Sequence, residues 1–261
     1  MGSLQSAELR LVLSIMISWH RSLIAALCTL LCATSLNAFQ LPASSKQCIV
    51  GIADGWNSSH VELRWFEKRA GKWQPVGAPW PGRLGKNGLI WGLGLHPVPK
   101  GAKTKIEGDM RSPAGVFRLG GVWGYAEAIQ KHPKLAYRQV TPRDLWVEDP
   151  ESPSYNLNVI LPHDPKTDWE RKQQMHQNDA AHSLKWFIAH NAKPNIIPNA
   201  GSSIFFHIWR RGGAAPTAGC TTMSEAKLKQ LIALADPQKM PLFVLLPRAE
   251  YERLAPIWKL P

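Results

Sequence analysis

The chain has 261 residues, which is enough to bury a sizeable core within a single domain. Hydrophobic residues make up 44% of it and charged residues 19%, a balance that excludes an intrinsically disordered protein. The net charge of +12 favours an acidic partner, but no helix-turn-helix, zinc-finger or RNA-binding motif accompanies that charge, so we expect no nucleic acid partner.

The N-terminal segment has the three-part plan of a secretory signal peptide. Arg21 precedes an apolar run, which gives way to small and polar residues up to Ala38. The run is shorter than the ~20 apolar residues of a membrane-spanning helix, so we expect cleavage after Ala38 and no permanent membrane span. Met16 is an alternative start that leaves a shorter leader. We therefore predict a signal peptide over residues 1–38, export to the periplasm or cell envelope, and a mature domain over 39–261.

Removal of this leader would leave two of the four cysteines in the mature chain. Cys28 and Cys32 fall within the leader, so the mature chain keeps only Cys48 and Cys220. Two cysteines in an oxidising compartment can form a disulfide, and this is one interpretation of the pair. The other is that Cys220 is a free and reactive thiol.

Short stretches rich in aliphatic, β-branched and aromatic residues predict a mostly β fold. In chain order these predicted strands are 47–52, 61–68, 72–76, 116–119, 157–161, 186–189, 203–209 and 241–246. Between residues 77 and 115 the density of Gly and Pro indicates a long run of turns. Ser224 is a good N-cap for a helix to about Ala235, and a second helical pattern begins near Asp168. We expect a single domain, built as a bent sheet or sandwich with one or two helices.

The segment FFHIWRRGGAAPTAGCTTM, from Phe205 to Met223, contains the candidate catalytic residues. His207 lies near the end of a predicted strand, and Cys220 follows Gly219 after a Gly-rich turn. A cysteine close to a helix N-terminus should have a lowered thiol pKa, which favours the nucleophilic thiolate. Gly219 permits a close backbone approach, so the amides of Gly219 and Cys220 could bind a developing oxyanion. The pattern predicts Cys220 as nucleophile and His207 as its base, although a lone Cys and His can also be core residues.

Two motifs in this chain resemble those of the L,D-transpeptidase catalytic domain family, the YkuD type. In that family a His on a strand precedes Ser/Thr-x-Gly-Cys, and here the second motif reads TAGC over residues 217–220. The family also carries Gly-Asp-x-x-(Ser/Thr)-Pro-x-Gly-x-(Phe/Tyr), and this chain has GDMRSPAGVF over 108–117. With the intervening LWVEDPESPSYN, the similarity spans roughly residues 47–247. The order His before Cys also differs from papain-like and NlpC-type cysteine hydrolases.

The chain departs from the family directly after the cysteine. Many members have an Ile/Val-Arg pair there, whose Arg is taken to help hold the substrate carboxylate, whereas this chain has Thr221 and Thr222. Arg210 and Arg211 could substitute, because a guanidinium offers a bidentate fork to a carboxylate. Plain solvent exposure is the other interpretation of these two arginines.

Three further residues are candidates for substrate contact: Thr217, Thr222 and His190. His190 could line the cleft or be a satisfied structural histidine. No His-Glu-x-x-His or paired Cys motif is present, so we expect neither a metal nor a cofactor. Asp109, in the first motif, is expected to brace a turn rather than act as an acid.

The resemblance implies a cysteine acyl-transfer enzyme that acts on the peptide stems of peptidoglycan, with a role in cell wall biogenesis and cell shape. In the family, the thiolate attacks the carbonyl of the third stem residue, releases the terminal D-alanine, and passes the thioester to an amine of a neighbouring stem. Water as acceptor would make the same site an L,D-carboxypeptidase. A non-catalytic wall-binding module is a third hypothesis, consistent with the basic charge and twelve Trp. The sequence does not predict an oligomeric state.

Overall fold

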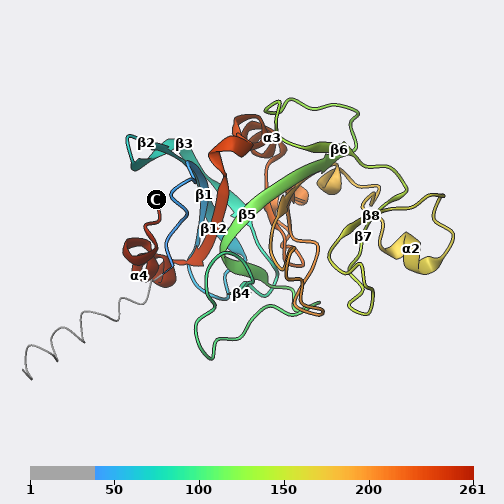
Figure 1. Ribbon diagram of the computed structural model, residues 1–261, viewed down its shortest axis with the longest axis horizontal. Coiled ribbons are helices and arrows are strands. Elements are labelled where there is room, and N and C mark those ends of the chain that lie inside the picture. Colours follow the sequence, from blue (N-terminus) through green and yellow to red (C-terminus); the bar gives the residue numbers. More distant parts are fainter. Residues whose placement is uncertain (1–38) are drawn as a thin grey trace, which may run out of the picture. The chain divides into compact units, whose positions relative to one another are not determined.

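Strands dominate the computed structural model, which describes residues 39–261 (Figure 1). The predicted signal peptide, with Cys28 and Cys32, lies outside the described residues. The strands are β1 (Gln47–Ala53), β2 (His60–Arg69), β3 (Lys72–Arg83), β4 (Leu89–Trp91), β5 (Ser112–Gly124), β6 (Tyr137–Gln139), β7 (Asp144–Trp146), β8 (Asn158–Ile160), β9 (Leu184–Ile188), β10 (Phe205–Ile208), β11 (Thr221–Met223) and β12 (Leu242–Pro247). The helices are α2 (Asp168–Lys172), α3 (Glu225–Leu234) and α4 (Arg248–Trp258), with short 3-10 turns η1 (Ala180–His182), η2 (Arg211–Gly213) and η3 (Pro237–Lys239). The predicted mostly β fold is confirmed, with three helices in the described residues where one or two were expected.

The main sheet bends until it closes on itself. Its strand order is β12-β1-β2-β3-β11-β10-β9-β5, and β12 pairs again with β5, so the first and last strands meet. That closing pair is antiparallel, with Phe243 opposite Phe117. The long strand β5 crosses the middle of Figure 1 next to β12 and also pairs with β4 and β6. Closure satisfies backbone groups that an open sheet would leave unpaired at its edges.

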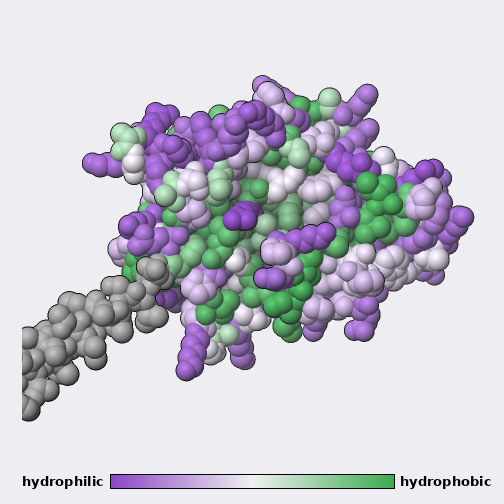
Figure 2. All heavy atoms as spheres, viewed as in Figure 1, coloured by the Kyte–Doolittle hydropathy of each residue, from purple (hydrophilic) through white to green (hydrophobic). Residues whose placement is uncertain are grey.

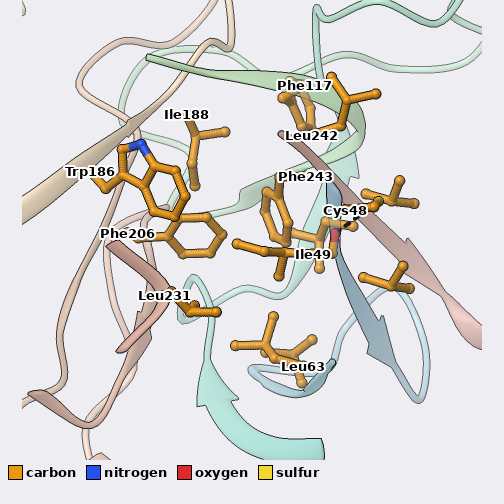
Figure 3. Packing of buried hydrophobic residues seen from close by; sticks show 14 of the residues in the cluster. Cys48, Ile49, Leu63, Phe117, Trp186, Ile188, Phe206, Leu231, Leu242 and Phe243 are labelled. Carbon is orange, nitrogen blue, oxygen red and sulfur yellow. Dashed lines mark hydrogen bonds between the residues drawn. The ribbon is translucent and has the colours of Figure 1, made fainter. Parts of the chain in front are cut away.

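Apolar side chains fill the inside of this closed sheet (Figure 3). Phe206 of β10 meets Phe243 of β12 with ring centroids 4.6 Å apart. Because side chains alternate along a strand, Phe205 and His207 point to the opposite face of β10 from Phe206. That outer face is also covered, and all four residues of β10 are buried. This explains why the strand reads FFHI with no exposed polar position.

The cover over the outer face of β10 is a second, smaller apolar cluster. Phe205 packs there against Trp146 of β7, with ring centroids 4.8 Å apart. Phe187 of β9 and Cys220 pack against the same cluster. The two-stranded sheet β7–β8 and helix α2 lie beside it, at the right of Figure 1. Cys220 therefore lies between the closed sheet and the segment that contains β7, β8 and α2.

Strand β3 differs from its prediction, because it continues to Arg83 through residues that read as turns. Leu63 pairs with Trp80 and Trp65 pairs with Val76, so the register shifts between these pairs. A bulge absorbs the intervening residues of β3, including Gly77 at a φ of 74°. The strand thereby reaches β11, which it pairs through Thr222 opposite Arg83.

Helix α4 was not predicted from the sequence. It contains Pro256 and is mostly polar, and only Leu254 and Trp258 are buried on it. Helix α3 lies where it was expected, with Ser224 accepting a hydrogen bond from the Lys227 amide. Within residues 39–261, none of the helices combines the length and the apolar character needed to cross a membrane.

Tryptophan contributes mainly to packing in this fold. Of the eleven Trp within residues 39–261, six are buried, namely Trp65, Trp80, Trp91, Trp146, Trp186 and Trp258. On the face shown in Figure 2, hydrophilic residues cover the β2–β3 end and the α2 end, and apolar residues gather between them. The buried indoles are not available to stack on an external ligand, which weakens the wall-binding hypothesis.

We predict that Trp258→Ala lowers the free energy of unfolding by ~3–5 kcal/mol, the usual cost of emptying a buried aromatic site. The ring is 5% exposed and packs against Phe39 and His96, with centroids 5.1 and 5.7 Å away. Ile257→Ala is the matched control on the same helix, because its side chain is 44% exposed. Urea denaturation of both variants checks this, and equal, small effects would show that α4 is not part of the core.

Candidate active site

Three neighbouring strands carry a row of polar residues on the outer face of the sheet. β10 pairs in parallel with β11, which puts His207 opposite Thr222, and antiparallel with β9, which puts His207 opposite Lys185. Side chains at opposed positions of neighbouring strands point to the same face. Thr222, His207 and Lys185 therefore form one row. The sequence did not single out Lys185, although a lone lysine in the apolar stretch LKWFI was a signal of a buried charge.

Cys220 lies beside this row, on the same face. It directly precedes β11, and its Sγ accepts a hydrogen bond from the amide of Phe205 at 3.4 Å. The thiol in turn donates to the carbonyl of Ser203, also at 3.4 Å. Cys48 is 0% exposed inside the closed sheet, and both cysteines are free. The disulfide interpretation of Cys48 and Cys220 is therefore wrong.

A cleft of about 330 Å³ runs along this face. It is lined by six of the predicted site residues, namely Cys220, His207, Gly219, Thr217, Thr222 and Arg210. Unpredicted polar residues also line it, among them Lys105, Glu107, Glu148, His182 and Lys185. The hydroxyl of Thr222 is buried and has no hydrogen-bond partner within residues 39–261.

Two predicted substrate residues do not line this cleft, and their assignment is corrected. His190 is 0% exposed, accepts a hydrogen bond from the Leu93 amide at Nδ1, and donates from Nε2 to the Ala200 carbonyl. Both ring nitrogens are thus occupied, and burial lowers the pKa of His190 to about 3. Arg211 lies in the exposed turn η2, away from the cleft wall.

The tautomer of His207 is fixed by the backbone. Its Nδ1 lies 2.9 Å from the carbonyl of Ile208, and since a carbonyl can only accept, Nδ1 carries the proton. The Nε2 lone pair is then available to take a proton. Burial, aided by the nearby His182, lowers the pKa of His207 to about 3, so the imidazole is neutral at rest.

A polar chain continues from His207 toward the rim of the cleft. The ring of His182 stacks on that of His207, with centroids 4.6 Å apart, and its Nδ1 lies 2.8 Å from a carboxylate oxygen of Asp179. Arg210 donates to the other Asp179 oxygen at 2.6 Å. Burial alone would raise the pKa of Asp179, but these hydrogen bonds outweigh it and lower the pKa to about 2. Arg210 therefore lines the cleft with its guanidinium already paired.

The thiol of Cys220 is neutral at rest, contrary to the sequence-based expectation. Burial raises its pKa to about 11, and a hydrogen bond from the Phe205 amide only partly offsets this. The expected helix N-terminus is not adjacent, because β11 intervenes and α3 begins only at Glu225. The favourable effect of a helix dipole is confined to its first turn. A proton must therefore leave sulfur as the thiol reacts, rather than beforehand.

Ser112, in the motif over residues 108–117, helps to hold the loop 217–220, which carries Cys220 and is called the cysteine loop below. Ser112 donates to the carbonyl of Gly219 at 2.7 Å and accepts from the amide of Gly85 at 2.9 Å. Thr217 donates to the carbonyl of Cys220 at 2.6 Å and accepts from the Gly219 amide at 3.1 Å. The Gly219 amide is therefore engaged and does not act as a free oxyanion donor, contrary to expectation. The Cys220 amide remains the candidate.

Gly219 is needed at its position for two physical reasons. Its φ is 153°, and a Cβ there would come within 3.0 Å of the Arg111 carbonyl and 3.4 Å of the Lys105 Nζ. Asp109 fixes these neighbours, because it accepts hydrogen bonds from Lys105 Nζ at 2.6 Å and from the Arg111 amide at 2.9 Å. Asp109 thus braces a turn, as expected. No group of three potential metal ligands (His, Cys, Asp or Glu) occurs in the described part of the chain.

Comparison with known proteins identifies one family. The family model of the L,D-transpeptidase catalytic domain, YkuD, matches residues 79–244, more than half of the chain, and this stretch contains both motifs. The crystal structure of the helical cell shape determining protein Pgp2 from Campylobacter jejuni is similar at 14% sequence identity and a TM-score of 0.35. That similarity covers 77% of this chain and 48% of the other, so the chain spans about half the length of that structure. No curated protein sequence matches this one.

We predict that alkylation of Cys220 by iodoacetamide accelerates about tenfold per pH unit from pH 7 to 10, without a plateau. A thiol whose pKa is about 11 is only slightly ionised over that range, whereas an unperturbed cysteine with a pKa near ~8.5 levels off. Mass spectrometry of the tryptic peptides follows the reaction, with the fully buried Cys48 as an internal unreactive control. A plateau below pH 9 would mean that the resting sulfur is a stabilised thiolate.

Ser112→Ala should loosen the cysteine loop, because it leaves the Gly85 amide and the Gly219 carbonyl without their partner. We expect a loss of ~1–3 kcal/mol in unfolding free energy and slower alkylation of Cys220. Ser183→Ala is the control, since that hydroxyl bonds only to the Ala180 carbonyl at an exposed turn. Should the two variants behave alike in urea denaturation and labelling, the first motif does not support the loop.

Proposed function

Because the chain belongs to the L,D-transpeptidase catalytic domain family, we propose that it is a cysteine acyl-transfer enzyme acting on peptidoglycan stem peptides. Cys220 is the nucleophile in this proposal and His207 the general base. The observation that carries it is the register of β10 and β11, which brings both residues to one face and into the wall of one cleft. Cys220 directly precedes β11, the strand that pairs with the strand of His207, so the two side chains come from neighbouring segments of one face.

Acylation begins from the neutral pair. The sulfur attacks the carbonyl of the third stem residue while the thiol proton passes to Nε2 of His207. This transfer creates no net charge, and the oxyanion and imidazolium that result attract each other. The oxyanion is stabilised by the Cys220 amide, and His207 then protonates the leaving amine, so the C–N bond breaks and D-alanine departs.

Deacylation uses the same groups in reverse. An amine of a neighbouring stem loses its proton to His207 and attacks the thioester carbonyl. The C–S bond then breaks, the new amide is released, and His207 returns the proton to sulfur. Water in place of the amine gives hydrolysis, the carboxypeptidase outcome. His182 stacks on His207 and is itself bonded to Asp179, which fixes the orientation of the His207 ring in both half-reactions.

The place of action in this proposal is the cell envelope. The signal peptide pattern of residues 1–38 supports export, with the catalytic domain over 39–261. A net charge of +12 supports attraction to the polyanionic envelope, which salt would screen. The acyl-transfer chemistry proposed for the domain uses only its own side chains and backbone, without a metal or cofactor.

Purified protein incubated with tetrapeptide stems tests the proposal by product mass. Crosslinked dimers indicate transfer, trimmed monomers indicate hydrolysis, and unchanged stems indicate a non-catalytic domain. Cys220→Ala should abolish turnover, because no other group in the cleft can form the thioester. His207→Ala should reduce it by ~10² to 10⁴, the usual contribution of a general base.

Cys48→Ala provides the control, since it removes the other thiol of the described chain without touching the cleft. We expect it to retain activity. Turnover that survives Cys220→Ala would rule out the nucleophile assignment, even if the products were those of an L,D-transpeptidase.

A further inference from the structure

Lys185 is a buried cation in the wall of the cleft, and nothing in the proposed acyl transfer uses it. Its side chain is 4% exposed, and its Nζ donates to the carbonyl of Met175 at 2.7 Å. An ammonium group has three protons to donate, so this bond leaves two without an assigned acceptor. No carboxylate within residues 39–261 lies within ion-pair distance of Lys185.

The position of Lys185 is fixed relative to the reacting groups. It lies opposite His207 across the β9–β10 pair, about one strand spacing away. Its Nζ lies 5.8 Å from the centroid of the Phe205 ring, and the amide of Phe205 is bonded to the Cys220 sulfur. The ammonium is also close enough to Cys220 to lower the pKa of its thiol.

A buried charge is costly unless it is paired, and Asp179 and Glu148 stabilise the Lys185 ammonium only from beyond ion-pair distance. Burial lowers the pKa of Lys185 to about 8, which still leaves the ammonium largely protonated at neutral pH. The other cations of the cleft are engaged: Lys105 is paired with Asp109, and Arg210 with Asp179. Lys185 is therefore the cation of this cleft that has room for an anion.

We propose that Lys185 binds a carboxylate of the acyl donor and so determines specificity for an anionic substrate. This inference rests on the proposed function, and it accounts for the absence of an arginine after the cysteine, where the chain has Thr221 and Thr222. The terminal carboxylate of the donor lies one residue beyond the attacked carbonyl, which is within reach of a group beside the nucleophile. A side-chain carboxylate of the attacked residue is the other source of the same chemistry.

A pair of small alkylating reagents tests the site independently of peptidoglycan. Iodoacetate and iodoacetamide both lose iodide to the Cys220 sulfur, and they differ in that only iodoacetate carries a carboxylate. Lys185→Met should lower the ratio of the iodoacetate rate to the iodoacetamide rate by about tenfold or more, because it removes a charged hydrogen-bond donor that only iodoacetate can use. Loss of the positive charge also raises the pKa of the Cys220 thiol, which slows both reagents alike. Lys185→Arg should recover part of the iodoacetate rate.

Lys229→Met removes one exposed positive charge from α3 and controls for bulk attraction, so it should leave the ratio of the two rates unchanged. Equal slowing of both reagents by Lys185→Met would leave the ratio unchanged and overturn the proposal. An unchanged iodoacetate rate would overturn it as well. Neither result bears on whether Cys220 performs acyl transfer.

Amidated donors identify which carboxylate binds. Wild-type protein and Lys185→Met are compared on a tetrapeptide stem, on its terminal carboxamide, and on the stem amidated at the side chain of the third residue. Amidation of the bound carboxylate should lower kcat/KM of the wild type to that of Lys185→Met and have no effect on the variant. If neither amidation does so, Lys185 does not bind the donor. If wild-type protein turns over no stem, the proposed function fails while the alkylation ratio still decides the anion site.

Discussion

The parallel pairing of β10 with β11 is the constraint on which the rest of the site depends. It places Phe206 opposite Thr221 and His207 opposite Thr222, so every second residue of both strands faces the cleft. A shift of one residue in that register would turn His207 into the closed sheet and expose Phe206. The aromatic core around Phe206 and Phe243 therefore secures the position of the base as well as the stability of the fold.

Burial on both faces of β10 also sets the protonation of the site. The apolar cluster that buries Phe205 and packs against Cys220 also includes Trp146. In that environment each charged form is disfavoured, which lowers the pKa of His207 and raises that of Cys220. The site is consequently built for proton transfer during attack, with an imidazole whose tautomer is fixed by the Ile208 carbonyl.

Local patterns in the sequence predicted much of this arrangement. The two motifs pointed to Cys220, His207 and Asp109, and the N-cap Ser224 located α3, because these features depend on neighbouring residues. What depends on packing between distant segments was missed. The charge state of Cys220 follows from burial and from the unforeseen strand β11, and the engagement of His190 follows from Leu93 and Ala200. The position of Lys185 beside His207 follows only from the pairing of β9 with β10.

The proposed mechanism requires that the Cys220 sulfur becomes covalently acylated by the donor. Intact-protein mass spectrometry after rapid mixing with a tetrapeptide stem measures this most directly, with proteolysis to locate the modified residue. We expect a transient mass increase equal to the donor without its terminal D-alanine, carried by the peptide that contains Cys220 and sensitive to hydroxylamine. Product formation without any adduct on Cys220, or an adduct on another residue, would contradict it.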